Sequence, residues 1–167
     1  MLVGLARNKK GDAEISALGE FGGQRAVDVL AEIIRDAAPD SRMRLVAIRA
    51  LASSPSRRGA EVLLSILEPS WPYRRDRAHA VSTLGTFGEH APVEALRRVL
   101  VEDEDVMVQL AAVDALQRVG TDESKAALSQ AAESEKLIPS LKARIARILK
   151  RMEAEGLKRR RPPGDAK

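Results

Sequence analysis

Apolar residues recur along this chain at helical spacing, in short segments that stop at glycine or proline. In the first such segment, Ile15, Leu18 and Phe21 lie three positions apart, and Gly22 follows directly. Aliphatic residues spaced by three and four positions mark the buried face of an amphipathic helix. No stretch of sequence is evident as a strand. The pattern therefore predicts an all-α chain of short amphipathic helices.

The helical segments repeat at a nearly constant interval. The anchor residues near the ends of the first helices are separated by 33, 33, 32 and 32 positions: Leu18, Leu51, Leu84, Leu116 and Ile148. The second helices align on four leucines separated by 33, 33 and 32 positions: Leu30, Leu63, Leu96 and Leu128. A period of this size is typical of helical repeat arrays, in which each unit buries its apolar face by stacking on its neighbours.

The repeat divides the chain into one repeat domain and a short tail. The domain is predicted over residues 1–156, with four helix pairs and one capping helix: about 10–36, 40–68, 71–102 and 103–135, then 140–155. Residues 157–167 contain a basic run that starts at Lys158, and we expect this tail to be disordered.

Two of the first helices share a more detailed motif. They read Asp40-Ser-Arg-Met43-Arg44-Leu-Val-Ala47-Ile-Arg-Ala50-Leu51 and Asp105-Val-Met-Val108-Gln109-Leu-Ala-Ala112-Val-Asp-Ala115-Leu116. Both resemble the helix Asp-x-x-Val-Arg-x-x-Ala-x-x-Ala-Leu of HEAT repeats, particularly the short bacterial and archaeal kind that also occurs in phycobilisome lyases. The third unit keeps Arg77 but has Tyr73 where the motif has its Asp.

The resemblance implies an all-α, right-handed α-α superhelix, a HEAT-like solenoid. First helices would form its convex side, and second helices would line its concave side. It also implies that an Asp and an Arg from adjacent units tie the stack together, which here would involve Asp40, Arg44, Arg77 and Asp105. The third unit would lack its Asp in this network. The motif is specific for architecture and says little about function.

Charge and composition narrow the classes of function. The chain has no Cys, which excludes disulfides, thiol catalysis and Cys-ligated zinc. Its net charge of +4 arises at one end, because residues 142–167 hold ten basic and three acidic residues (+7), whereas residues 1–141 hold eighteen and twenty-one (−3). The repeat body is therefore not basic, which disfavours nucleic acid as its ligand. No apolar run reaches the roughly 20 residues of a membrane span, and a soluble, cytoplasmic protein is expected.

Residues for catalysis are not apparent in the sequence. The two histidines, His79 and His90, occur in neither HxxxH nor HExxH spacing. Gly19–Gly23 fits a turn between helices, and Glu102–Asp105 fits the solvated start of a helix. We therefore expect no catalytic, metal or cofactor residues and a protein that is not an enzyme.

A first set of candidate binding residues lies on the second helices. Two positions before the anchor leucines stand Asp28, Glu61 and Glu94, and two positions after Leu96 stands Arg98. On the concave side these residues would form a mixed but partly acidic groove. Such a groove suits a protein surface or a basic peptide better than a phosphate backbone, which the acidic row would repel.

A second set lies at the start of the third unit. Trp71, Tyr73, Arg74 and Arg75 cluster there, and Arg42 occupies the matching place one unit earlier. Tryptophan, tyrosine and arginine are the residue types that most often anchor protein interfaces. Packing between units is an equally good explanation for Trp71.

Three functions fit these features. The first is a non-catalytic scaffold or adaptor, most simply a monomer, that binds another protein by its concave groove or by the Arg/Trp-rich edge of the third repeat. The second is a nucleic-acid-binding protein that uses the arginine clusters and the basic tail. The third, suggested only by the repeat subtype, is an accessory protein that is bilin lyase-like or chaperone-like.

Overall fold

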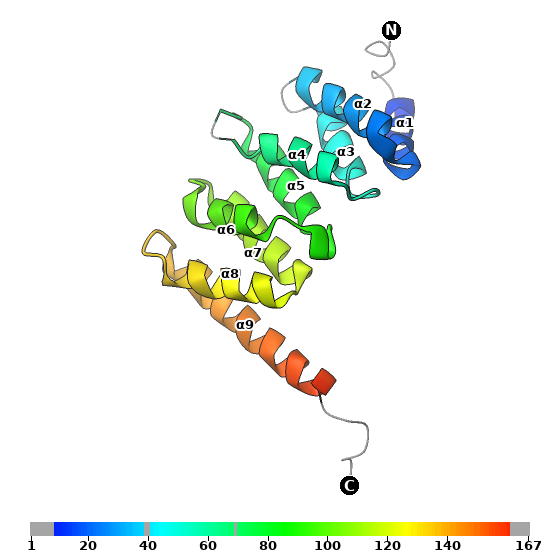
Figure 1. Cartoon of the computed structure of the whole chain (residues 1–167). Helices are drawn as coiled ribbons and strands as arrows, with labels where there is room; N and C mark the ends of the chain where they lie inside the picture. Colours follow the sequence, from blue (N-terminus) through cyan, green and yellow to red (C-terminus); the bar gives the residue numbers. More distant parts are fainter. Residues whose placement is uncertain (1–8, 39–40, 69, 161–167) are drawn as a thin grey trace.

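The computed structural model describes residues 9–38, 41–68 and 70–160, and this part of the chain is helical with connecting turns (Figure 1). Four helix pairs follow one another and a long single helix closes the array. The bounds are α1 Lys9–Phe21, α2 Gly23–Asp36, α3 Arg42–Ala50, α4 Arg57–Ser65, α5 Arg74–Leu84, α6 Val93–Glu102, α7 Val106–Val119, α8 Asp122–Glu133 and α9 Pro139–Arg160, with a short 3-10 turn, η1 Gly88–His90, before α6.

The predicted α-solenoid of four helix pairs and a capping helix is confirmed. The capping helix is longer than predicted, because α9 continues through Gly156 to Arg160 instead of ending at residue 155. One glycine costs a helix about 1 kcal/mol, and the Leu, Lys and Arg residues that follow are good helix formers. The remainder of the predicted tail, residues 161–167, lies outside the described residues, as does Asp40. No described helix has the length and apolarity needed to cross a membrane.

The anchor residues of the repeat form the centre of the core. Leu51, Leu84 and Leu116 are at most 1% exposed, and so are the four leucines on which the second helices align: Leu30, Leu63, Leu96 and Leu128. Phe21, in contrast, is 89% exposed and does not extend the stripe of Ile15. It is the last residue of α1.

The first helices stack side by side at two glycine contacts. A Cβ atom on Gly19 would lie 2.2 Å from the Ala50 carbonyl oxygen, and one on Gly85 would lie 2.7 Å from the Cα of Ala115. These contacts bring α1 close to α3 and α5 close to α7. At the junction between α3 and α5, the equivalent repeat positions hold Ala52 and Thr83, which are larger.

The second helices form a separate layer, and this layer is interrupted at its middle. α2 packs against α4, and α6 packs against α8, but α4 and α6 make almost no backbone contact with each other. The junction between the second and third repeats is thus the loosest in the array. Its first helices meet without a glycine contact, and its second helices stand apart.

Candidate functional site

A buried ion pair joins the second and third repeats. Arg44 of α3 and Asp76 of α5 are 3% and 2% exposed, and Nη1 of Arg44 donates to Oδ2 of Asp76 at 2.9 Å. The guanidinium group also donates from Nε to the Ile34 carbonyl at 2.9 Å and from Nη2 to the Ala37 carbonyl. One arginine therefore connects three helices, because both carbonyls belong to the end of α2.

Two aromatic residues at the start of the third repeat, Trp71 and Tyr73, enclose this ion pair. The guanidinium carbon of Arg44 lies 5.4 Å from the ring centre of Trp71 and 4.9 Å from that of Tyr73, and the two rings meet edge to face. The indole Nε1 of Trp71 donates to Oδ2 of Asp76 at 3.3 Å. Cation–π contacts of this kind stabilise a guanidinium group that has lost water. Trp71 and Tyr73 thus have a packing role in the chain itself.

The Asp that the sequence motif lacks is supplied at another position. Tyr73 does occupy the motif position, but Asp76, three residues later, accepts the hydrogen bond from Arg44. Three positions are less than one helical turn, so Asp76 sits within reach of the same neighbour. The expectation that the third unit had lost its member of the network was therefore wrong.

The next junction contains a second ion pair. Arg77 of α5 donates from Nε and Nη2 to the two carboxylate oxygens of Asp103, at 2.9 and 3.1 Å, and from Nη1 to the Trp71 carbonyl at 3.1 Å. Asp105 caps α7 by accepting from the Met107 amide at 2.8 Å. Arg44 and Arg77 thus connect neighbouring units, as the family motif implied, but the acidic partner of Arg77 is Asp103 and not the motif residue Asp105.

The candidate edge arginines differ in how they are held. Arg42 forms an ion pair with Asp12 at 2.6 Å, and Arg74 lies 3.5 Å from Asp105. Both arginine side chains are more than three-quarters exposed. Arg75 is exposed, and its interactions within the described chain are limited to its electrostatic effect on His79.

His79 lies where the first helices of the second and third repeats meet. Partial burial lowers its pKa, and the nearby positive charges of Arg49 and Arg75 lower it further, against an opposing effect of Asp76. His90 is exposed at the end of η1. In the described ranges no group of His, Cys, Asp or Glu is arranged to hold a metal ion.

The predicted acidic row on the second helices is matched by arginines of the same surface. Asp28 pairs with Arg58 at 3.3 Å, and Arg58 also reaches Glu61 at 3.4 Å. Hydrogen bonding from Arg97 lowers the pKa of Glu94, to which Nε of Arg97 donates at 2.8 Å. These three carboxylates are therefore largely neutralised within the chain.

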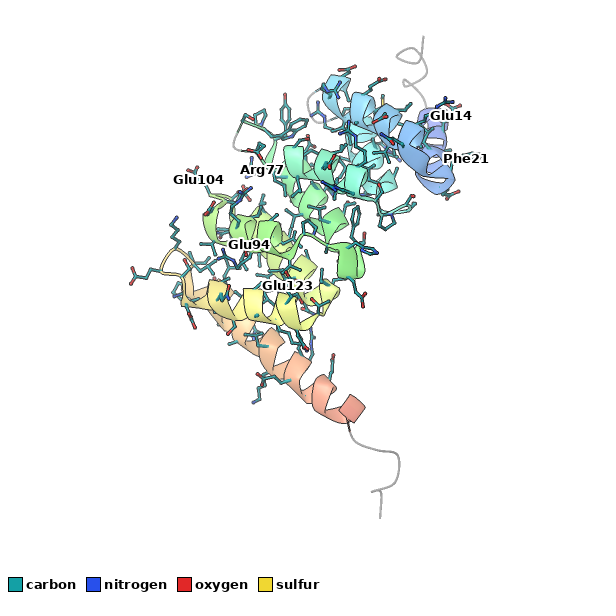
Figure 2. The ribbon with its side chains drawn as sticks, in the orientation of Figure 1. Glu14, Phe21, Arg77, Glu94, Glu104 and Glu123 are labelled. Carbon is teal, nitrogen blue, oxygen red and sulfur yellow. The ribbon has the colours of Figure 1, made fainter. Side chains whose placement is uncertain are left out.

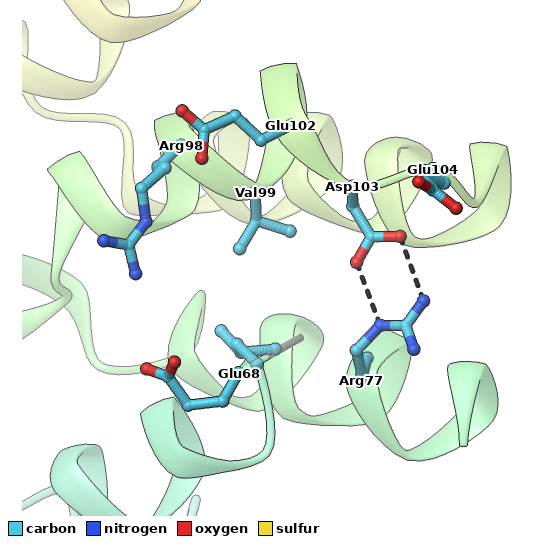
Figure 3. A pocket seen from close by; sticks show the side chains of 8 residues that line it. Glu68, Arg77, Arg98, Val99, Glu102, Asp103 and Glu104 are labelled. Atoms are coloured by element: carbon cyan, nitrogen blue, oxygen red, sulfur yellow. Dashed lines mark hydrogen bonds and ion pairs between the residues drawn. The ribbon is translucent and has the colours of Figure 1, made fainter. Parts of the chain in front are cut away.

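A cleft of about 560 Å³ opens where α4 and α6 stand apart (Figure 3). Glu68 and Arg98 lie at one end of it and the Arg77–Asp103 pair lies at the other. Its full lining is Leu67, Glu68, Arg77, Arg98, Val99, Glu102, Asp103 and Glu104. Four carboxylates face two guanidinium groups here, so the formal charge of the cleft is −2.

Of the predicted candidates, the cleft contains only Arg98. Sequence reasoning missed Glu68, Glu102 and Glu104, which come from the ends of the second helices in the second and third repeats. One signal was available: Glu102 ends its helix and Glu68 lies just beyond one, where the helix dipole disfavours a negative charge by about 0.3–1 kcal/mol. Acids near the ends of two successive second helices, α4 and α6, are therefore not explained by helix stability.

Comparison with known proteins agrees with this architecture. A family model described as HEAT repeats matches residues 13–78 and again residues 72–150. Each match covers two of the helix pairs, and the boundary falls at the junction that Arg44 and Asp76 hold together. Among curated proteins, no sequence gave a match. Because the family model covers most of its length, the chain belongs to the HEAT-repeat family.

Proposed function

We propose that this HEAT-repeat chain is a non-catalytic scaffold that binds a partner protein on its second-helix side, at the cleft between α4 and α6. The observation that supports this choice is the cleft itself, about 560 Å³ in volume and lined mainly by charged side chains. HEAT repeats commonly act as scaffolds for other proteins. A solenoid presents an extended surface along its layer of second helices for this purpose.

The second-helix side is a better binding surface than the edge of the third repeat. Trp71 and Tyr73 would be the strongest anchors on that edge, but both contact the Arg44 guanidinium group. A partner protein that used these two rings as anchors would have to disrupt the junction between two repeats. Arg74 and Arg75 remain on the edge as exposed charges, which alone contribute little to affinity.

The charges of the cleft favour a protein partner over nucleic acid. Its carboxylates outnumber its guanidinium groups by four to two, and a phosphate backbone would be repelled. Neither Trp71 nor Tyr73 lines the cleft, so it offers no aromatic face for a base or for a bilin chromophore. The tail residues 161–167, on which the nucleic-acid alternative partly depends, lie outside the described chain.

Site-specific photo-crosslinking tests the proposed function. A photoreactive amino acid replaces Ser65, the exposed last residue of α4 and two residues before the cleft residue Leu67, or Arg75, which is exposed on the third-repeat edge. Each variant is irradiated in an extract of cells that naturally express the chain. We expect a protein adduct with the Ser65 variant and a much weaker one with the Arg75 variant.

Two results would reject the scaffold at the cleft. One is equal crosslinking from both positions, or crosslinking only from position 75. The other is salt-sensitive binding of random duplex DNA at about 50 mM salt without any protein adduct, which would favour the nucleic-acid alternative.

A further inference from the structure

The cleft between α4 and α6 gathers charged side chains that have no close partner among the described residues. The Arg77–Asp103 pair is complete, because both carboxylate oxygens of Asp103 accept from Arg77. Glu68, Glu102 and Glu104 are exposed, and so is Arg98. Within the described ranges, these four side chains make neither a hydrogen bond nor an ion pair with another residue. The cleft thus presents three carboxylates and one guanidinium group without a close partner, although Glu102 acts electrostatically on Arg97 and Arg98 on Glu94.

The acids elsewhere on the layer of second helices, in contrast to those of the cleft, are paired with arginines. The acids Asp28, Glu61 and Glu94 are each paired with Arg58 or Arg97. Those arginines lie on α4 and α6 themselves, so the sequence places a positive charge near each acid of the row. At the cleft Arg77 is held by Asp103, and among the residues described no arginine forms an ion pair with Glu68, Glu102 or Glu104. On this surface, the cleft is therefore where a positive charge from another molecule would be stabilised most by carboxylates.

The backbone adds to the negative potential of the cleft. Glu68 follows the C-terminal end of α4, and Glu102 is the last residue of α6. Each helix end carries a partial charge of roughly −0.5 from its unpaired carbonyl groups. Two such ends line one cleft, together with the three carboxylates. This is the electrostatic environment of a site for a cation.

The shape of the cleft and its apolar floor indicate which kind of cation can bind there. Val99 is 7% exposed and Leu67 is half-buried, and these two residues form its apolar part. Lysine and arginine combine an aliphatic stem with a charged end, so they can cover this floor while the charge reaches the carboxylates. A metal ion has no suitable group of ligands in the described chain. The guanidinium group of Arg98 can donate to a peptide carbonyl, which a simple polyamine does not have.

We infer that the cleft binds a Lys/Arg-bearing segment of the partner protein, with one basic side chain lying over Leu67 and Val99 and its charge among Glu68, Glu102 and Glu104. The inference rests on the proposed scaffold function, to which it adds the chemistry of the bound segment. It requires no change in the chain, because α4 and α6 already stand apart.

The test measures binding of a fluorescein-labelled octapeptide of alternating glycine and arginine by fluorescence anisotropy at about 50 mM salt. The cleft variant is Glu68→Gln/Glu102→Gln/Glu104→Gln. Its matched control is Glu14→Gln/Glu20→Gln/Glu89→Gln, which changes the net charge equally at exposed residues outside the cleft. Figure 2 shows Glu14 on α1, at the far end of the array from Arg77 and Glu104. All substituted residues are exposed, and both variants should remain folded by circular dichroism.

We expect the cleft variant to bind the peptide about tenfold more weakly than the unmodified chain, since three exposed ion pairs are each worth roughly 0.2–1 kcal/mol. The control should lose less than about twofold. Equal weakening in both variants would mean that net charge alone attracts the peptide, and the inference would fall. It would also fall if spermidine bound as tightly with the same dependence on the three glutamates.

Failure here can be distinguished from failure of the scaffold function. If the Ser65 variant still captures a protein but the cleft variant binds the peptide normally, the scaffold stands and the basic segment is wrong. If the Ser65 variant captures nothing, the proposed function itself fails, whatever the peptide does.

Discussion

The buried pair of Arg44 and Asp76 gives the sharpest prediction about the stability of the array. Asp76→Ala removes the carboxylate but leaves the guanidinium group of Arg44 buried between α2, α3 and α5. Two carbonyls of α2 and the rings of Trp71 and Tyr73 would still contact it. The remaining contacts are all to neutral groups, so the buried charge loses its counter-ion.

The size of the effect follows from the burial of both partners. Removing one member of a buried ion pair costs about 3–5 kcal/mol. We expect a value near the lower end, about 3 kcal/mol, because the carbonyls and rings still stabilise Arg44. That is a large part of the roughly 5–15 kcal/mol that holds a domain folded. It corresponds to a fall in melting temperature of about 6–12 °C for a chain of this size.

Urea denaturation followed by circular dichroism at 222 nm measures the loss. The matched control is Asp114→Ala, which removes a similar cross-repeat partner of Arg144 where the two side chains are 46% and 42% exposed. An exposed pair contributes at most about 1 kcal/mol. The double variant Arg44→Met/Asp76→Leu should recover part of the stability, but the Ile34 and Ala37 carbonyls would lose their donor.

A loss below about 1 kcal/mol for Asp76→Ala, no larger than that of Asp114→Ala, would refute the view that this pair fixes the junction. The view would also be refuted if the loss for Arg44→Met/Asp76→Leu equalled the sum of the losses for Arg44→Met alone and Asp76→Leu alone, because residues that interact show non-additive effects.

Two further predictions concern packing and pH. Gly85→Ala should lower the free energy of unfolding by about 1–3 kcal/mol, and with it the melting temperature, because the added methyl group overlaps α7. A higher melting temperature, as expected when alanine replaces an unhindered helical glycine, would contradict the close approach of α5 and α7. The pKa of His79 is lowered in the folded chain, first by burial and then by Arg49 and Arg75. The unfolded chain therefore binds more protons, and stability should fall as the pH falls below the unfolded-state pKa of about 6.5. His79→Gln should remove this part of the pH dependence, and an unchanged profile by thermal denaturation would show that His79 does not cause it.

The repeat and its helices could be predicted from the sequence because both arise from local periodicity. Burial of the anchor leucines requires only that each helix pair stack on the next. The spacing of Leu51, Leu84 and Leu116 therefore places the core without any knowledge of distant contacts. Phe21 continues the spacing of Ile15 and Leu18 but is exposed, so periodicity alone does not place every apolar residue in the core.

The aromatic cluster could not be assigned from the sequence. Trp71 and Tyr73 have the composition of an interface anchor, and only the three-dimensional structure shows the Arg44 guanidinium group against both rings. The contact joins residues that are about one repeat apart in sequence. The same holds for Asp76, whose shift from the motif position matters only because Arg44 can reach it.

The cleft depends on how closely two repeats approach each other. Glycines at positions 19 and 85 allow two junctions to close, whereas Ala52 and Thr83 occupy the equivalent places in the junction between them. We attribute the separation of α4 and α6 to this difference. Side chains at the helix ends then line the gap, and no periodic pattern identifies them in advance.

The most direct test of the account is to sequence, by mass spectrometry, the partner segment that crosslinks to position 65. This position is the last residue of α4, three residues before Glu68 of the cleft. We expect a single protein segment with a net positive charge that contains Lys or Arg at the crosslinked site. An acidic or neutral segment would contradict the charge complementarity, and the same segment captured equally from position 75 would contradict the cleft as the binding site.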